Sequence, residues 1–348
     1  MIALRLMSIS LCRISCCAFL ALCVTLAATS QISAAEQGSG YAKRPEVREF
    51  IDSLAQEQGF GKRALLRLFS RVQTQTSAIR AMSAPVTTPP KWFEYAPRFL
   101  SPERVSGGIA FRNTHRAALE RAETEFGVPA EVIVAIIGVE TFYGRIAGNY
   151  RVLDALTTLA FDYPRRADYF REELKQFLLL TREWKISPLQ PRGSFAGAMG
   201  VPQFMPTSIR RYAVDYDTDG RIDLWSDMDD VIGSVANYLS RYGWERGGPV
   251  LVPATVDSDA GRTTVGDNGL SERRDYVAWT AINVTAQDAT GIDPQWAAAL
   301  VLLENSDGPT YRLGFNNFYV LTRYNRSRLY AAAVWDLAQA IRSAEGPR

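Results

Sequence analysis

The chain has 348 residues, of which 47% are hydrophobic and 22% charged, a composition typical of a folded globular protein. Its 39 lysines and arginines nearly balance 37 aspartates and glutamates, which argues against an electrostatic nucleic-acid binder. The single histidine, His115, and the four cysteines, all before residue 24, exclude a histidine-rich zinc site and a Cys–His pair in the later chain. They also leave a serine triad poorly supported.

Residues 1–35 resemble a cleavable secretory signal peptide. Two arginines, Arg5 and Arg13, precede an apolar run over residues 16–28, and small residues follow up to Ala35. The run is short for a membrane span, and a retained anchor is the alternative interpretation. We therefore expect export to the periplasm, with cleavage after Ala35.

A lipoprotein fits this segment poorly, because Leu22 instead of a small residue precedes Cys23. All four cysteines lie within the predicted signal peptide, so the mature chain would have no disulfide and no thiol nucleophile. Removal of residues 1–35 removes two arginines and no acidic residue, which changes 39 basic and 37 acidic residues to 37 of each. The mature protein is thus expected to carry a net charge near zero.

Helical patterns occupy most of the remaining chain. A Pro-rich, aromatic segment at 85–97 and a Gly-rich bend at 193–206 interrupt them. His115 lies within one helical pattern and is expected to be a surface or cap residue. Apolar spacing predicts helices in these ranges: 45–72, 102–126, 153–159, 167–184, from 207 onward, 231–242 and 327–344.

The pattern changes between residues 249 and 315. Aspartate, glycine and threonine separate short β-prone runs at 250–252, 279–284 and 298–303. Strand-like and turn-like pieces follow at 310–324. The sequence therefore predicts a mainly α protein (α+β class) with a small β insertion.

The segment Val128–Gly144 runs almost wholly apolar for two helical turns after Glu131 and then delivers one carboxylate, Glu140. Pro129 and Glu131 suit the start of a helix, where the positive end of the dipole lies. Burial disfavours an ionised carboxylate, so the pKa of Glu140 should rise. A carboxyl group that stays protonated in an apolar cleft suits general-acid cleavage of a glycosidic bond. The alternative is a glutamate that only caps or pairs at a buried helix end.

Three segments occur in order along the chain: IIGVETFYGR (136–145), SFAGAMGVPQFMPTS (194–208) and NFYVLTRYNRSRLYAAAVWDLAQAI (317–341). Together they resemble the lytic murein transglycosylase B family, which includes soluble and membrane-bound enzymes. The resemblance extends from about Val47 to the end of the chain. It implies a lysozyme-like helical core with an added helical lobe.

The resemblance also implies an activity, which is cleavage of the β-1,4 bond between N-acetylmuramic acid and N-acetylglucosamine in peptidoglycan. In this family a single glutamate protonates the leaving oxygen while the muramoyl N-acetyl group assists at the anomeric carbon. The same carboxylate then deprotonates the 6-hydroxyl of the sugar, which gives a 1,6-anhydromuramoyl end. Glu140 matches that glutamate by position. Glu183 and Glu304 are competing carboxylates that are better interpreted as structural or surface groups.

Polar and aromatic residues match the positions that contact substrate in this family. Small residues around Ser194 and Gln203 would let the backbone pass close to a sugar, although a tight turn with incidental polar groups is the alternative. Val201 and Pro202 stand where a Tyr-Gly pair also occurs in the family, which leaves the loop shape open. Tyrosine suits a glycan groove, because its ring packs on a sugar and its hydroxyl bonds it. The predicted substrate-binding residues are Ser194, Gln203, Tyr324, Asn325, Tyr330, Tyr95, Tyr169 and Tyr238.

An aspartate-dense loop has the start of an EF-hand pattern. Aspartates occupy positions 1, 3, 5 and 9, and Gly220 occupies the sixth position. The twelfth position is Ser226, and the family implies that a later aspartate, Asp229 or Asp230, completes the loop. The predicted ligands of a structural Ca²⁺ ion are Asp215, Asp217, Asp219, Arg221 and Asp230. The alternative is a solvated acidic turn that caps the next helix.

The leading hypothesis is an exported, monomeric peptidoglycan lytic transglycosylase that needs no cofactor for its chemistry. Its partners would be glycan strands, with cell-wall synthases as candidates and no nucleic acid. A hydrolytic muramidase and a catalytically silent peptidoglycan-binding protein are the alternatives. The expected organisation is a signal peptide (1–35), an N-terminal helical region (36–127), a lysozyme-like catalytic core with the EF-hand-like loop (128–248), the β insertion (249–315) and a C-terminal segment that completes the groove and helical lobe (316–348).

Overall fold

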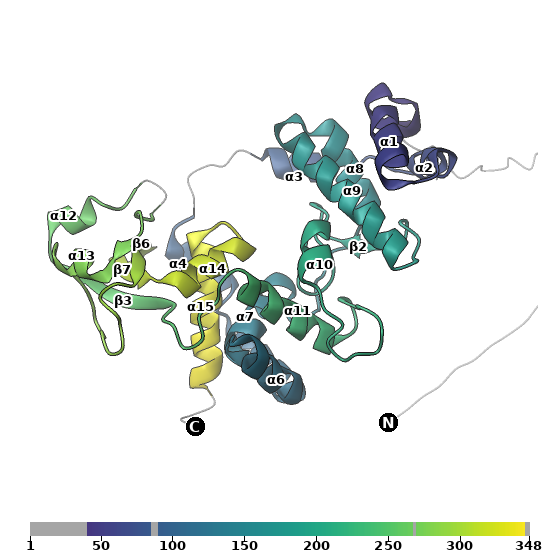
Figure 1. Cartoon of the computed structure of the whole chain (residues 1–348). Coiled ribbons are helices and arrows are strands. Elements are labelled where there is room, and N and C mark those ends of the chain that lie inside the picture. Colours follow the sequence, from purple (N-terminus) through teal and green to yellow (C-terminus); the bar gives the residue numbers. More distant parts are fainter. Residues whose placement is uncertain (1–39, 85–89, 267–268, 345–348) are drawn as a thin grey trace, which may run out of the picture. The chain divides into compact units, whose positions relative to one another are not determined.

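The computed structural model describes residues 40–84, 90–266 and 269–344. They belong to a compact unit of the chain, Gly38–Arg348, and the predicted signal peptide lies outside them. The described residues are mainly helical and contain one five-stranded sheet and one two-stranded ribbon (Figure 1). This confirms the predicted mainly α class with a small sheet. None of the helices in these ranges is long and apolar enough to cross a membrane.

A group of helices from two parts of the sequence forms what we call the outer lobe. In it α8 packs along α9 and contacts α3, and α1 packs on α2 (Figure 1). Its elements are η1 (Tyr41–Lys43), α1 (Pro45–Gln58), α2 (Lys62–Phe69), α3 (Thr76–Ser83), α8 (Val152–Asp162), η3 (Pro164–Arg166) and α9 (Ala167–Glu183). The sequence predicted one helical stretch over 45–72. The structure breaks it at Gly59, whose φ of 68° is easily adopted only without a side chain.

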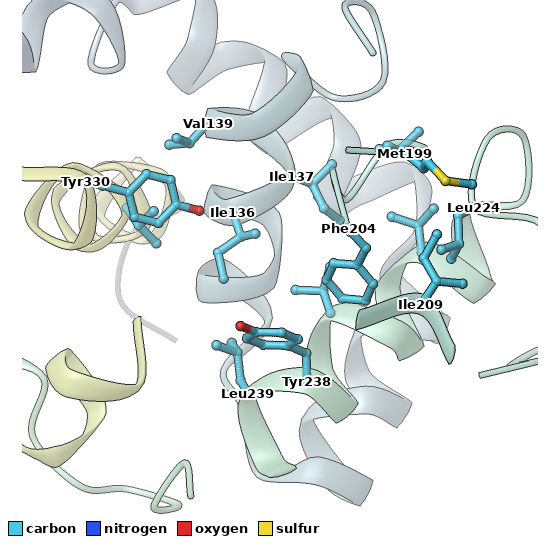
Figure 2. Packing of buried hydrophobic residues seen from close by; sticks show 14 of the residues in the cluster. Ile136, Ile137, Val139, Met199, Phe204, Ile209, Leu224, Tyr238, Leu239 and Tyr330 are labelled. Carbon is cyan, nitrogen blue, oxygen red and sulfur yellow. The ribbon is translucent and has the colours of Figure 1, made fainter. Parts of the chain in front are cut away.

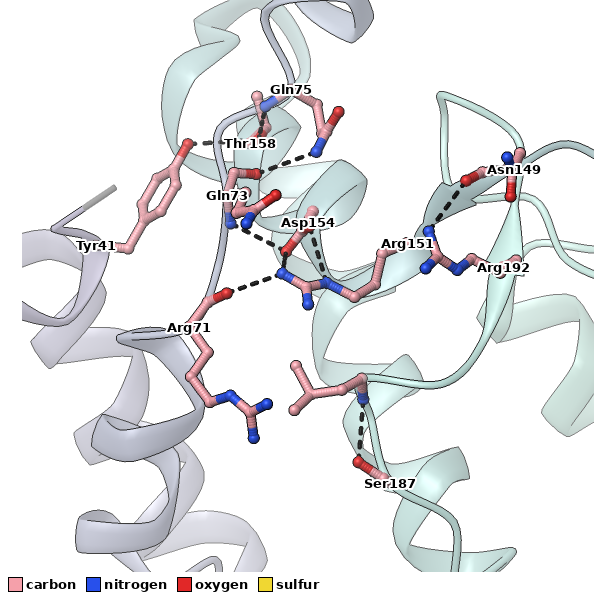
Figure 3. A network of polar contacts seen from close by, with 11 residues as sticks. Tyr41, Arg71, Gln73, Gln75, Asn149, Arg151, Asp154, Thr158, Ser187 and Arg192 are labelled. Carbon is pink, nitrogen blue, oxygen red and sulfur yellow. Dashed lines mark hydrogen bonds and ion pairs between the residues drawn. The ribbon is translucent and has the colours of Figure 1, made fainter. Parts of the chain in front are cut away.

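Polar contacts attach the segment between α2 and α3 to the start of α8 (Figure 3). The buried Asp154 carboxylate accepts hydrogen bonds from the Arg151 guanidinium at 2.8 Å and from the Gln73 backbone N–H at 3.1 Å. The Thr158 hydroxyl accepts the backbone N–H of Gln75 at 3.0 Å. A buried carboxylate without such partners would be strongly destabilising, so these contacts fix the register of the segment on α8.

A central helix, α7 (Ala130–Thr141), lies at the centre of the helical core. Of its 12 residues, 11 are buried, and Glu140 alone keeps partial exposure. It contacts α15, α5, α11 and α6, and this enclosure confirms the expected burial on every face. Figure 2 shows apolar residues of α7 and of the segments around it, namely Ile136, Ile137, Val139, Phe204, Tyr238 and Leu239.

The sequence predicts one helical stretch over 102–126, before α7, and the structure divides it into two helices. α5 (Pro102–Thr114) and α6 (Arg116–Phe126) meet at His115, whose φ and ψ of −109° and 28° interrupt the helix. The half-buried His115 ring packs on Phe111 with 4.5 Å between ring centroids. His115 is therefore a cap residue at a helix junction, one of the two roles expected for it.

A short ribbon joins the residues just before α8 to the segment after α9, and two more core helices follow. β1 (Tyr150–Arg151) pairs antiparallel with β2 (Arg192–Gly193), and isolated bridges continue through the Gly-rich bend. α10 (Pro206–Tyr212) and α11 (Met228–Arg241) then follow, as predicted. The side chain of Asp227 caps α11 by accepting the backbone N–H groups of Asp229 and Asp230.

The β insertion is an antiparallel sheet of order β4-β6-β7-β3-β5. Its elements are β3 (Leu251–Val256), α12 (Asp259–Arg262), β4 (Arg274–Asp275), α13 (Tyr276–Thr280), β5 (Val284–Ala286), β6 (Ala297–Asn305) and β7 (Gly308–Gly314). The prediction of a strand over 279–284 is in part wrong, because Trp279 lies in α13 and β5 begins only at Val284. Its indole N–H donates to the carbonyl of Ala298 at 2.9 Å, which fixes this fully buried side chain beneath the sheet.

Two helices close the chain. The predicted strand and turn pieces at 310–324 are in part wrong: β7 ends at Gly314, and α14 (Asn316–Tyr324) follows. The Asn317 amide N–H groups donate to the carbonyls of Glu245 and Gly248, and its carbonyl oxygen accepts the N–H of Glu245. These contacts anchor the start of α14. The last helix, α15 (Arg328–Ser343), packs against α7.

Candidate active site

Glu140 occupies the last turn of α7, where the buried helix reaches partial exposure. The hydroxyl of Tyr330, from α15, donates to its Oε1 at 2.6 Å. Burial raises the pKa of Glu140 to about 7, and the hydrogen bond from Tyr330 opposes that rise. The carboxyl group can therefore both give and accept a proton near neutrality.

An unusual turn follows Glu140 directly. Phe142 and Tyr143 have φ values of 52° and 61°, in the left-handed region that residues other than glycine rarely adopt. The Thr141 hydroxyl lies 3.0 Å from the carbonyl of Val201 and accepts the N–H of Gly144 at 3.0 Å. The turn is thus held by contacts to the Gly-rich bend.

A contact between Tyr143 and Arg104 of α5 braces the same turn. The Tyr143 hydroxyl donates to the carbonyl of Arg104 at 2.7 Å, and the Arg104 guanidinium donates to the carbonyl of Gly138. The guanidinium also lies 4.7 Å from the ring centroid of Phe142. A Cβ on Gly138 would lie 2.7 Å from the Tyr143 ring, so this packing requires glycine. Sequence reasoning missed Arg104 and Gly138, since nothing local marks residues that act through distant contacts.

Tyrosines predicted to line the groove gather around Glu140. The rings of Tyr324 and Tyr330 stack at 6.4 Å between centroids, and Tyr238 lies 4.9 Å from Tyr324. Burial, and then the charge of Glu140, raise the pKa values of Tyr95 and Tyr324, which places both within electrostatic reach of the carboxylate. Figure 2 shows the hydroxyl of Tyr330 directed toward α7.

Two of these tyrosines also hold backbone segments in place. The Tyr324 hydroxyl donates to the carbonyl of Pro202 at 2.7 Å, and the Tyr238 hydroxyl donates to the carbonyl of Arg323 at 2.7 Å. These bonds connect α14 to the Gly-rich bend and to α11. The tyrosine cluster is thus a rigid wall beside the acid.

In the Gly-rich bend, Gln203 and Ser194 bond to the backbone. Gln203 has a φ of 53°, and its amide nitrogen donates to the carbonyls of Ala147 at 3.0 Å and Gly200 at 2.9 Å. The Ser194 hydroxyl accepts the backbone N–H groups of Ala196 and Ala198. In the described chain neither side chain bonds to Glu140. Their predicted contacts to sugar remain predictions.

The other two predicted groove residues lie outside the tyrosine cluster. Tyr169 on α9 is 38% exposed and packs on Phe170, with the Arg166 guanidinium 4.2 Å from its ring centroid. Asn325 is exposed at the end of α14. Among the described contacts, neither residue touches Glu140. A substrate role for both remains a prediction.

The two competing carboxylates have structural surroundings. Glu183 forms an ion pair with Arg210 at 2.6 Å. Glu304 lies on β6, where its charge acts on Arg328. Among the three candidates, therefore, only Glu140 combines a buried helix end with a single tyrosine partner.

The aspartate-dense loop brings three carboxylates together. Oxygen atoms of Asp215, Asp217 and Asp230 lie within 4.8 Å of one another, which makes them the group in the described chain able to share a cation. Asp230 is buried and accepts the N–H groups of Tyr216 at 2.6 Å and Asp223 at 2.7 Å. The geometry thus favours Asp230 over Asp229 as the last acidic ligand. An all-oxygen set of this kind suits Ca²⁺.

The other two predicted calcium ligands lie on the exposed side of this loop. The Asp219 carboxylate accepts the N–H of Arg221 at 2.8 Å, so it is engaged within the loop itself. Arg221 is exposed. Their part in coordination remains a prediction.

A family model described as the transglycosylase SLT domain matches residues 42–339. The chain belongs to this lytic transglycosylase family. It is 42% identical over 315 residues to the membrane-bound lytic murein transglycosylase B of Escherichia coli, covering 88% of this chain and 85% of that protein. This transglycosylase is accordingly an enzyme that acts on peptidoglycan, as predicted.

Solved structures agree with this assignment. The soluble lytic transglycosylase SltB1 of Pseudomonas aeruginosa is 46% identical with a TM-score of 0.82, covering 87% of this chain and 100% of that one. An Escherichia coli lytic transglycosylase solved in complex with calcium is 41% identical with a TM-score of 0.82, covering 91% of this chain and 99% of that one. The resemblance inferred from three sequence segments is therefore confirmed.

Proposed function

We propose that this transglycosylase cleaves the β-1,4 bond between N-acetylmuramic acid and N-acetylglucosamine without water, with Glu140 as both acid and base. The observation that carries the proposal is the pKa of Glu140, which burial raises to about 7. A group with a pKa near the working pH is suited to donate a proton in one step and accept one in the next. Glu183 and Glu304 have structural surroundings, so a route that needs a second carboxylate is less well supported.

The proposed route has two proton transfers, both at the Glu140 carboxyl group. Oε1 of Glu140 is held by Tyr330, so Oε2 carries the proton to the glycosidic oxygen as the bond to the anomeric carbon breaks. The muramoyl N-acetyl oxygen attacks the anomeric carbon from the opposite face and forms an oxazolinium ion. The Glu140 carboxylate then removes the proton of the 6-hydroxyl, whose oxygen displaces the N-acetyl oxygen. The product is a 1,6-anhydromuramoyl end, and Glu140 is protonated again.

The surrounding residues would orient the glycan strand. Tyr324 and Tyr95 are partly exposed near Glu140 and offer ring faces or edges that pack well on the apolar face of a sugar. Tyr330 is buried, and its hydroxyl would act at the site by holding the acid. Gln203 is fixed by two backbone carbonyls, which leaves its amide oxygen to accept a sugar hydroxyl. We propose Ser194, Asn325, Tyr169 and Tyr238 as further contacts along the strand.

The aspartate loop would bind Ca²⁺ through Asp215, Asp217 and Asp230, with Asp219 and the backbone carbonyl of Arg221 completing the shell. The fit of these oxygen atoms and the calcium complex of the Escherichia coli relative support this. The ion would neutralise three clustered carboxylates and pin the loop that precedes α11. It would have no part in the proton transfers.

We further propose that the protein works in the periplasm after cleavage of residues 1–35, as a monomer on glycan strands. The catalytic core would correspond to 128–248, between the N-terminal helical region (36–127) and the β insertion (249–315). Residues 316–348 would complete the groove, which the bond from Tyr330 to Glu140 supports.

Mass spectrometry of muropeptides released from murein sacculi tests the proposed activity. The mature wild type should release 1,6-anhydromuropeptides, and Glu140→Gln should reduce release by about 10³-fold or more. Glu183→Gln, at the partly exposed ion pair with Arg210, is the matched control and should keep wild-type activity.

Two other outcomes would replace the proposal. Products with reducing ends would show a hydrolytic muramidase. Intact sacculi that still pellet with the wild-type protein would show a peptidoglycan-binding protein without catalysis.

A further inference from the structure

One buried side chain joins the turn after Glu140 to the Gly-rich bend. Thr141 directly follows Glu140 at the end of α7 and is 1% exposed. Its hydroxyl lies 3.0 Å from the carbonyl oxygen of Val201 and 3.3 Å from that of Ile137, and it accepts the N–H of Gly144 at 3.0 Å. A threonine hydroxyl has one hydrogen to donate and two lone pairs to accept with. Thr141 therefore bonds to the bend, or back into α7, with its hydrogen and to the turn with a lone pair.

The turn that Thr141 holds has a backbone conformation that needs support. Phe142 and Tyr143 are consecutive residues with side chains and a positive φ. Such a conformation is unfavourable and persists only where the surrounding structure holds it. The Thr141 hydroxyl bonds to Gly144, and its backbone carbonyl accepts the N–H of Ile146 at 2.9 Å. Both ends of the turn are thus attached to the residue that follows the acid.

The bend is itself fixed on its other side by the aspartate-dense loop. The N–H of Val201 donates to the carbonyl of Leu224 at 2.7 Å. A Cβ on Gly200 would lie 2.6 Å from the same carbonyl oxygen, so the bend and the loop are in close contact. The carbonyl of Pro202 accepts the hydroxyl of a tyrosine in the wall beside the acid at 2.7 Å. With both neighbours held, the Val201 carbonyl offers Thr141 an acceptor in a fixed position.

The Glu140 carboxyl group depends on such support. Among the described contacts, the hydroxyl of Tyr330 donates to Oε1 at 2.6 Å, and no second donor holds Oε2. The position of Oε2 therefore depends on the backbone of Glu140, which α7 fixes before the residue and Thr141 fixes after it. Proton transfer requires a distance close to that of a hydrogen bond, so a small shift of this backbone should slow the reaction.

We propose that Thr141 is a positioning residue, whose hydroxyl holds the Glu140 carboxyl group in place against the Gly-rich bend during both proton transfers. The inference rests on the proposed role of Glu140 in cleavage. Thr141 is buried, so it touches neither the sugar nor the transferred proton. Its loss should therefore lower kcat and leave substrate affinity nearly unchanged.

The first test uses Thr141→Val, which keeps the shape of the side chain and removes the hydroxyl. With soluble glycan strands as substrate, kcat for release of 1,6-anhydro ends should fall about 10- to 100-fold, the cost of a slightly misplaced acid. KM should stay within about twofold of the wild-type value. Thr141→Ser retains the hydroxyl and should recover most of the kcat. Thermal unfolding shows whether each variant is folded, and the smaller Thr141→Ala replaces the valine variant if that one does not fold.

A double-mutant cycle with Tyr330→Phe separates positioning from a general loss of stability. If Thr141 and Tyr330 hold the same carboxyl group, their separate losses in kcat should not multiply in the double variant. Thr157→Val is the matched control. Thr157 is a fully buried threonine of α8 whose hydroxyl has no hydrogen-bond partner in the described chain, so this variant should keep the wild-type kcat.

Four results would overturn the proposal. They are a wild-type kcat in the folded valine or alanine variant, a loss that appears in KM instead of kcat, an equal impairment of Thr141→Ser, and losses that multiply with that of Tyr330→Phe. Failure of the proposed activity looks different, since the wild type itself would then release no anhydro ends.

Discussion

Glu140 can serve in two successive proton transfers because two features of its surroundings shift its pKa in opposite directions. Burial at the end of α7 disfavours the carboxylate, whereas the hydrogen bond from Tyr330 favours it, and the resulting pKa is about 7. A carboxyl group with an ordinary pKa would be a poor acid at neutral pH because it would already be ionised. A carboxyl group with a much higher pKa would also be a poor acid, because it would be too weak to protonate the leaving oxygen.

The raised pKa of Glu140 should make stability depend on pH. Between the unfolded value of 4.5 and the folded value of about 7, the native state binds more protons than the unfolded state, so the free energy of unfolding falls as pH rises. Glu140→Gln removes this fall. Between pH 4.5 and 8, the free energy of unfolding of the variant should therefore rise by about 2–3 kcal/mol relative to that of the wild type. Denaturant titrations at both pH values measure the gain. A constant difference between wild type and variant at the two pH values would contradict it.

The hydrogen bond from Tyr330 should be visible in the pH profile of cleavage. It lowers the pKa of Glu140, so Tyr330→Phe should move the alkaline limb of kcat/KM upward by about one pH unit, the equivalent of one lost hydrogen bond. Tyr238→Phe is the control, because its hydroxyl donates to the carbonyl of Arg323 instead of Glu140. An alkaline limb that stays in place in Tyr330→Phe would exclude the bond as a determinant of this pKa.

At the scale of elements, the contact between α5 and α7 fixes the turn that presents the acid. Gly138→Ala would place a Cβ 2.7 Å from the Tyr143 ring, which cannot retreat easily because its hydroxyl donates to Arg104. We expect a loss of about 1–3 kcal/mol in stability and a lower kcat. Thermal unfolding and turnover of murein test both. Gly61→Ala, where the nearest atom would be 3.8 Å away, should change neither by much.

The loop before α11 should couple calcium to stability. Three clustered carboxylates repel one another, and a bound cation would remove that repulsion while binding only the folded loop. We expect added Ca²⁺ to raise the Tm of the wild type by several degrees, a rise that Asp217→Ala abolishes. Asp229→Ala, outside the three-carboxylate group, should keep most of the rise. An unchanged wild-type Tm on addition of Ca²⁺ would contradict the proposed calcium site.

The elements that sequence predicted best are those with an unbroken apolar pattern. α7 is apolar at nearly every position, and α9 has regular helical spacing, so burial alone determines both. α14 was missed because its start depends on Asn317, whose amide bonds to residues about 70 positions away. Trp279 was misplaced for a similar reason, since its indole bonds across the sheet to Ala298.

The candidate site likewise contains residues that the sequence predicted and residues that it did not. Glu140 was identifiable because a carboxylate that ends a long apolar run in a helix is conspicuous, and motif resemblance added the surrounding tyrosines. Arg104 and Gly138 were not identifiable, because they act through Tyr143 and the turn after Glu140. Spacing within one segment carries no information about such contacts between segments.

At the scale of the whole described chain, the hydrophobic residues form two clusters. One fills the helical core and includes α7, and the other lies in the β insertion around Trp279, Leu300 and Phe315. β6 contributes to both, since Leu300 belongs to the sheet cluster and Leu303 to the helical one. A strand buried on both faces explains the continuous apolar run that the sequence shows there.

Two clusters predict two units of local stability. Trp279→Ala should remove about 3–5 kcal/mol from the sheet cluster, because it empties a fully buried site. Hydrogen exchange should then increase in residues 251–314 while the amides of α7 stay protected. Phe177→Ala, fully buried in the helical cluster, should increase exchange in the helices first. If Trp279→Ala instead increases hydrogen exchange in α7 to the same extent, the strand shared by both clusters makes the described chain unfold as one unit. The sheet then cannot open independently of the helix that carries Glu140.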